Sequence, residues 1–165
     1  MMAALISLNA LAIDTMLPAL GVIADHYQLA NSNDQQLVVF AYILGFGAPQ
    51  LIFGPLSDRF GRRGLLLLCL IGYTILSFAS MVTSTFQALL FVRFIQGVVA
   101  SGIRVIASSI IRDYMAGRSM ARVMSLVLTV FMIVPILAPA LGQAVMMVAP
   151  WQWTFGVLGL SLIHI

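Results

Sequence analysis

The chain has 165 residues, of which 62% are hydrophobic and only 8% are charged. A soluble domain keeps roughly a quarter of its residues charged so that its surface stays hydrated, and this composition therefore excludes a soluble globular protein. The net charge of +3 does not indicate a nucleic-acid partner, because the arginines lie in short clusters between apolar runs rather than on a solvated face. The composition places the chain in a lipid bilayer.

Six long apolar runs follow one another along the chain. A helix needs about 20 apolar residues to cross ~30 Å of hydrocarbon, and these runs are continuous rather than alternating, which favours helices over a β-barrel. We therefore expect an all-α membrane protein with six transmembrane helices. The predicted spans are 3–24, 37–56, 64–82, 86–110, 123–148 and 151 onward.

The loop arginines predict the orientation of the spans. Six arginines lie in two of the five loops, and the other three loops contain none. They are Arg59, Arg62 and Arg63 after the second span, and Arg112, Arg118 and Arg122 after the fourth. Because basic loops remain on the cytoplasmic side, we expect these two loops and the amino terminus in the cytoplasm.

The loop between the second and third spans reads GPLSDRFGRRG over residues 54–64. We expect it to reverse the chain within about seven residues, with Gly54 allowing close helix approach, Gly61 permitting the turn and Asp58 accepting from a helix amino terminus. An ordinary basic turn remains an alternative. The string resembles the signature loop of the major facilitator superfamily, whose Asp and Arg form a conformational latch with the other half of the protein. The latch set implied by this resemblance is Gly54, Asp58, Arg59, Gly61, Arg62 and Arg63.

The fourth span carries polar and small residues on one side. At 3.6 residues per turn they form a single stripe, which should face the helix bundle. The stripe consists of Arg93, Gln96, Gly97, Ala100, Ser101 and Arg104. An Arg at the bilayer centre costs ~3 kcal/mol or more and stays charged, so Arg93 needs a partner or water. Arg104 lies nearer the cytoplasm. Its side chain could equally extend toward the lipid headgroups instead of facing the bundle. Residues 89–101 also resemble a second signature of the superfamily, L-x-x-x-R-x-x-Q-G-x-x-A, which is associated with proton coupling.

The first span contains one carboxylate, Asp14, about eleven residues into the run and ~16 Å deep. Desolvation favours the protonated form of a carboxyl group, so Asp14 is a candidate proton carrier, and we expect it to face Arg93. A protonated Asp that only satisfies a neighbouring helix is the alternative. The string DTMLPAL resembles the motif T-D-x-Y-L-P-A-L of the bicyclomycin and chloramphenicol resistance branch, with Asp14 and Pro18 matching. Met16 replaces the aromatic residue, so substrate preference does not carry over.

The fifth span contains two prolines four residues apart, Pro135 and Pro139, followed by Gly142. Two missing backbone donors predict a bent, closely packed helix, and a kink without functional meaning is the alternative. The segment resembles the exporter signature G-P-x-x-G-G, with Ala138 and Gln143 in place of two glycines. The strings at 111–113 and 151–155 also resemble the drug-exporter branch.

Other function classes lack their sequence signals. There is no phosphate-binding G-x-x-x-x-G-K-[ST] loop, no histidine, cysteine or Glu set at metal-ligand spacing and no nucleophile–base pair. We therefore expect neither an enzyme nor a bound cofactor or metal.

The resemblance covers residues 3–159 and implies the amino-terminal half of a twelve-helix major facilitator fold. It implies a proton antiporter of the bacterial inner membrane that exports lipophilic, often cationic, drug-like compounds. Its partners would be the lipid bilayer, the substrate, the proton and the missing carboxy-terminal half. The alternatives are a solute importer of the same superfamily and a non-transporting membrane scaffold.

The last six residues, 160–165, read LSLIHI and resemble the translation of a transposase adapter used in sequencing libraries. We therefore expect a natural bundle over 1–159, truncated in its sixth span, and an artefactual tail over 160–165.

Overall fold

The computed structural model describes residues 2–164, which are helical apart from short connections. The expectation of an all-α protein is confirmed. In chain order the α-helices are α1 (Met2–Asp14), α2 (Leu20–His26), α3 (Leu37–Gly47), α4 (Gln50–Phe60), α5 (Arg62–Met81), α6 (Phe86–Tyr114), α7 (Gly117–Val148) and α8 (Trp153–His164). Two 3-10 helices, η1 (Leu17–Ala19) and η2 (Ser32–Gln36), connect the first three.

Four helical segments of the described chain are long and apolar enough to cross a membrane: Ala4–His26, α5, α6 and α7. A fifth span results if α3 and α4, bent by 47° at their junction, are counted as one. These five correspond to the first five predicted spans. Helix α8 has only 12 residues, so the sixth transmembrane helix and the artefactual tail stay predictions.

The first span, predicted as one helix over 3–24, is interrupted at its middle. Helix α1 ends at Asp14, and η1 and α2 continue the span. Pro18 lacks the N–H that would bond to the carbonyl of Asp14, four residues earlier, and its ring clashes with that carbonyl. Pro49 acts in the same way at the junction of α3 and α4, where it occupies the position before the first residue of α4.

The two basic loops are much shorter than predicted. Helix α4 continues to Phe60, so Gly61 alone separates it from α5, and its φ of 85° confirms the permissive turn. Likewise, only Met115 and Ala116 separate α6 from α7. The predicted loops 57–63 and 112–122 are therefore wrong, because their polar residues extend the helices beyond the apolar spans.

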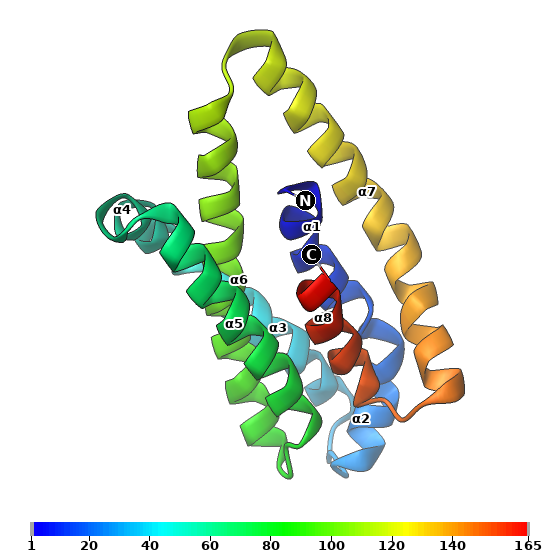
Figure 1. Cartoon of the computed structure of the whole chain (residues 1–165). Helices are drawn as coiled ribbons and strands as arrows, with labels where there is room; N and C mark the ends of the chain where they lie inside the picture. The colour runs from blue at the N-terminus through cyan, green and yellow to red at the C-terminus, as the bar shows by residue number, and fades with distance from the viewer. Residues whose placement is uncertain (1, 165) are drawn as a thin grey trace.

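Helix α6 is central to the packing and contacts α1, α3, α4 and α5. Its closest neighbour is α3, where Gly97 faces the carbonyl of Tyr42 and Gly45 faces the carbonyl of Phe94, so that a Cβ at either glycine would collide with backbone. Small residues commonly allow such close approach between membrane helices. Helix α1 lies between α6 and α7, and α8 packs on α5 (Figure 1).

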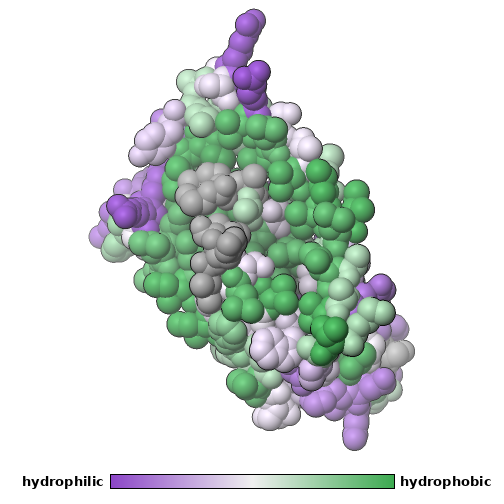
Figure 2. Space-filling view, turned by 45° about the vertical axis from the view of Figure 1, so that its right-hand side comes forward, coloured by the Kyte–Doolittle hydropathy of each residue, from purple (hydrophilic) through white to green (hydrophobic). Residues whose placement is uncertain are grey.

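The outer surface is strongly apolar. Leu68 and Ile75 on α5 are 67% and 62% exposed, and Ile136 on α7 is 75% exposed. Figure 2 shows apolar side chains over most of one face, with polar residues gathered at the ends. Such a surface suits hydrocarbon contact, and in water it would favour aggregation.

Candidate functional site

Arg93 lies at the centre of the bundle, with its side chain fully buried. Its Nη1 donates to Oε1 of Gln96 at 2.8 Å, and its Nη2 donates to the carbonyl of Ala12 on α1 at 3.0 Å. Gln96 in turn donates through Nε2 to Oγ of Ser77 on α5 at 2.8 Å. The buried charge is therefore held by polar groups from three helices.

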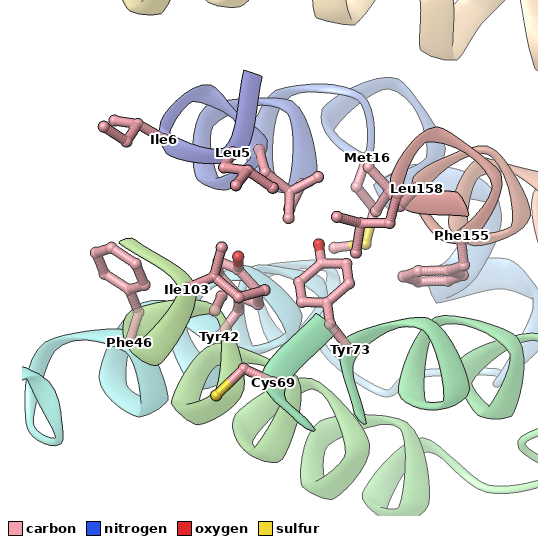
Figure 3. Close-up of a cluster of buried hydrophobic side chains, with 14 of the residues drawn as sticks. Leu5, Ile6, Met16, Tyr42, Phe46, Cys69, Tyr73, Ile103, Phe155 and Leu158 are labelled. Carbon is pink, nitrogen blue, oxygen red and sulfur yellow. The ribbon is translucent and has the colours of Figure 1, made fainter. Parts of the chain in front are cut away.

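Aromatic rings enclose the same guanidinium. Its carbon lies 4.6 Å from the ring centroid of Tyr42 on α3 and 5.3 Å from that of Phe155 on α8, both within cation–π range. Figure 3 shows Tyr42 and Tyr73 projecting from α3 and α5 toward α1 within a cluster of buried side chains. The hydroxyls of both tyrosines and Nε of Arg93 have no hydrogen-bond partner among the described residues. Neither tyrosine is predictable from the sequence, because the only signal at each position is a single phenol in an apolar span.

The stripe on α6 faces the interior of the bundle, as predicted. Its buried residues are Arg93, Gln96, Gly97, Ala100 and Ser101. Gly97 has a packing role, because it lies directly against the backbone of α3. Gln96 connects Arg93 to Ser77, a hydrogen bond between residues 19 positions apart.

The expected direct pair between Asp14 and Arg93 is wrong. Among residues 2–164, the ion pairs involve Arg62 alone, and Arg93 bonds to the carbonyl of Ala12 instead. Asp14 follows Ala12 by two residues and so lies on roughly the opposite side of α1. The first and fourth spans do meet near these residues, but through the backbone carbonyl of Ala12.

Helix α7 packs directly on the break in the first span. A Cβ at Gly142 would collide with the carbonyl of Thr15, the residue after Asp14. Pro135 and Pro139 lie inside α7, which remains one continuous helix through both. The close packing expected here is present at Gly142, and the prolines do not divide the span.

The latch loop is attached to the end of α6 through Arg62. Its guanidinium pairs with Asp113, donates to the carbonyl of Ser109 at 2.8 Å and contacts Asp58 at 3.3 Å. Asp58 thus accepts from a side chain, and the expected cap at a helix amino terminus is wrong. In the sequence, Asp113 belongs only to the string at 111–113 that resembles the drug-exporter branch.

The remaining latch residues are less constrained. Gly54 has no atom near the position of a Cβ, so its expected role in close helix approach is wrong. Arg59 lies 5.6 Å from the ring of its neighbour Phe60, and both Arg59 and Arg63 are exposed.

Arg104, the last residue of the stripe, lies between two rings. Its guanidinium carbon is 5.6 Å from the ring centroid of Phe46 on α3 and 5.6 Å from that of Phe131 on α7. It is partly exposed rather than buried.

An apolar groove of about 540 Å³ runs between α1, α7 and α8. Neither Asp14 nor Arg93 lines it, and Leu160 and Ser161 of the predicted tail contribute to its wall. The groove is therefore no basis for a substrate site.

Several membrane-length apolar helices, packed through glycines around a buried arginine network, define a multi-pass membrane protein. The model of the Major Facilitator Superfamily matches residues 2–163, so the chain belongs to that superfamily. This is a family of transporters, which confirms that the protein is not an enzyme.

Three bacterial relatives are similar over most of the chain. Over 92% of this chain, the sequence is 34% identical to an uncharacterized MFS-type transporter, YdgK, of Bacillus subtilis. Over 94% of this chain, it is 36% identical to a chloramphenicol resistance protein of Pseudomonas aeruginosa. It is 33% identical to the multidrug resistance protein MdtL of Escherichia coli O157:H7 over 81%. The chain spans only 35–38% of the length of these relatives.

Proposed function

We propose that this chain is the amino-terminal half of a drug:proton antiporter that exports lipophilic drug-like compounds across the inner membrane of a bacterium. Two of its relatives are named for chloramphenicol or multidrug resistance, and both come from bacteria. A second six-helix half would complete the substrate cavity. The amino terminus and the two arginine-rich loops would face the cytoplasm.

The observation that carries this proposal is the position of Asp14. The carboxylate lies at the break of the first span, two residues after the carbonyl that Arg93 holds. Backbone at such a break can rearrange more easily than backbone inside a continuous helix. Protonation of Asp14 would remove a charge from the membrane interior and so alter the relative stability of the two access states.

Arg93 has a different part in this mechanism. It cannot lose its proton, so it provides a fixed positive charge near the site where the mobile proton binds. Its bond to the carbonyl of Ala12 couples α1 to α6, so that a shift of α1 at Asp14 must stretch or break a buried hydrogen bond. Arg93 is thus proposed as a positioning residue for the proton site.

The latch loop would govern the cytoplasmic side. Arg62 already connects the end of α4, the start of α5 and the end of α6. Asp58 and Arg59 are exposed and so are available to the second half of the transporter. Loss of contacts between the halves would accompany opening toward the cytoplasm.

The proposal is tested in everted membrane vesicles that contain the full-length protein. With an imposed proton gradient, the wild type should accumulate chloramphenicol, and Asp14→Asn should bind the drug but lose gradient-driven accumulation. Asp25→Asn, which changes an exposed aspartate at the end of α2, is the matched control and should transport normally. Full coupling in Asp14→Asn would assign the proton to another residue, and gradient-driven transport in the opposite direction would indicate an importer.

A further inference from the structure

The stripe on α6 carries two arginines, and each lies beside a ring from α3. Arg93 faces Tyr42, and Arg104, eleven positions later, faces Phe46. Tyr42 and Phe46 are stacked, with ring centroids 6.4 Å apart and an interplanar angle of 10°. A second ring completes each site, from Phe155 for Arg93 and from Phe131 for Arg104.

The two arginines differ in their hydrogen bonds. Arg93 is fully buried and donates to Gln96 and Ala12. Within the described chain, the arginine side chains that donate hydrogen bonds are Arg62, Arg93 and Arg112, and Arg104 is not among them. Nor does any described carboxylate pair with Arg104. Its guanidinium keeps up to five N–H donors for another acceptor.

The position of Arg104 does not match a side chain extended to the headgroups. An Arg that extends toward the membrane surface packs its stem along apolar side chains and keeps its guanidinium in water. Here the guanidinium lies between rings on two other helices, α3 and α7, and Phe131 itself packs against the buried core. The charge is therefore directed between helices of the bundle while part of the side chain remains accessible.

We propose that Arg104, Phe46 and Phe131 form a substrate subsite for an aromatic group that carries an anionic substituent. A guanidinium binds an oxyanion through charge-assisted hydrogen bonds, and the two phenyl rings would contact the aromatic part of the ligand. A cationic group is disfavoured there by charge repulsion. This inference deepens the proposed export function by naming the chemical class that this part of the cavity accepts.

Two fluorescent probes test the subsite directly. 8-Anilino-1-naphthalenesulfonate and N-phenyl-1-naphthylamine share the same aromatic framework, and only the first carries a sulfonate. Each is titrated into full-length protein in phosphatidylcholine nanodiscs, and the signal of empty nanodiscs is subtracted. Since one charge-assisted contact of about 1.4 kcal/mol corresponds to a tenfold change, Arg104→Gln should weaken sulfonate-probe binding at least about tenfold. It should change binding of the neutral probe less than about twofold.

Matched variants separate the subsite from general effects of charge. Arg122→Gln removes an exposed arginine near the start of α7 and should leave both affinities unchanged. Arg104→Lys should retain part of the preference for the sulfonate. Unchanged affinities in Arg104→Gln would overturn the proposal. Equal weakening of both probes would also overturn it, because it would show that Arg104 supports the structure, for example by pairing with an acid of the second half.

The result is independent of proton coupling. Probe binding needs no proton gradient. If Arg104→Gln loses affinity for the sulfonate probe alone, the subsite is supported, even if the wild type shows no gradient-driven transport. Conversely, gradient-driven transport that depends on Asp14, together with no effect of Arg104→Gln on either probe, would retain the antiporter and exclude the subsite.

Discussion

Helix α1 ends at Asp14, and Pro18 is the residue whose missing N–H leaves the carbonyl of Asp14 without its helical partner. Asp14, the carboxylate nearest the middle of the first span, therefore lies at the point where the span is broken. Gly142 of α7 packs on the next residue, Thr15, so a movement at the break must also affect α7.

Pro18→Ala should restore the missing donor and allow α1 to continue into α2. One recovered hydrogen bond of about 1 kcal/mol would change the ratio of the two access states about fivefold. We expect unchanged or higher thermal stability together with slower drug efflux, measured in the same vesicle preparation. Pro55→Ala, inside the continuous helix α4, is the control and should not slow efflux. Normal efflux in Pro18→Ala would mean that the break is not needed for transport.

Gly97→Ala tests the packing of α6 on α3. The added Cβ would meet the carbonyl and backbone of Tyr42, which cannot move aside as a flexible side chain could. We expect destabilisation by about 1–3 kcal/mol, read as a lower midpoint of thermal unfolding in detergent. Gly47→Ala, where the surrounding space is open, should keep the wild-type midpoint. Equal midpoints for the two variants would contradict the close packing.

Arg62→Gln should separate the latch loop from the end of α6. The side chain is 28% exposed and its partners Asp58 and Asp113 are 66% and 47% exposed, so solvent screens the pairs. Exposed ion pairs contribute ~0.2–1 kcal/mol, and we expect stability to change little while transport falls. Asp113→Asn should reproduce the defect, and Arg122→Gln, at an exposed arginine outside the latch set, should not. A transport defect in Arg122→Gln but not in Arg62→Gln would place the latch elsewhere.

The predicted orientation is checked by thiol labelling. Cysteines introduced at Phe60 and Met115 should resist a membrane-impermeant maleimide in intact cells, whereas one at Asn31 should react. The native Cys69 is buried, at 2% exposure, and provides a low background. Labelling of Phe60→Cys from outside would reverse the topology.

The sequence predicted the parts of this site that follow from periodicity. Apolar run length located the first five spans, and the stripe on α6 correctly placed Arg93 and Gln96 inside the bundle. Periodicity describes one helix at a time, however. It could not identify the carbonyl of Ala12 as the acceptor for Arg93, 81 positions away, because that choice depends on the relative height of two helices.

The predicted bounds of the two basic loops are wrong for a different reason. Charged residues at 57–63 and 112–122 predict loops, although a helix can continue into water beyond its apolar span. Asp58 of α4 and Arg62 of α5 pair across the turn at Gly61 rather than along one helix. The bond from Arg62 to Ser109, which spans 47 positions, is also not visible in a local pattern.

Arg93→Lys tests whether the shape of the guanidinium matters or only its charge. The planar guanidinium of Arg93 donates to Gln96 and to the carbonyl of Ala12 on α1 at the same time, and rings from α3 and α8 contact it. Gln96 also donates to Ser77, so the network around Arg93 joins α6 to α1, α3, α5 and α8. A lysine ammonium is a compact point charge and cannot reproduce both bonds in this geometry. One buried acceptor left without its donor costs about 1–3 kcal/mol, which should appear as a lower unfolding midpoint.

Arg93→Lys should also impair the coupling of transport to the proton gradient, because it weakens the bond from α6 to the carbonyl of Ala12, two residues before Asp14. The decisive comparison is the ratio of gradient-driven to counterflow transport, since counterflow needs binding and access but no net proton movement. We expect Arg93→Lys to lower this ratio. Ser77→Ala, which removes the acceptor of the Gln96 amide and leaves the bond from Arg93 to Gln96 in place, isolates the α5 branch of the network. If Arg93→Lys kept the wild-type ratio, a positive charge alone would suffice, and the bond to Ala12 would have only a structural role.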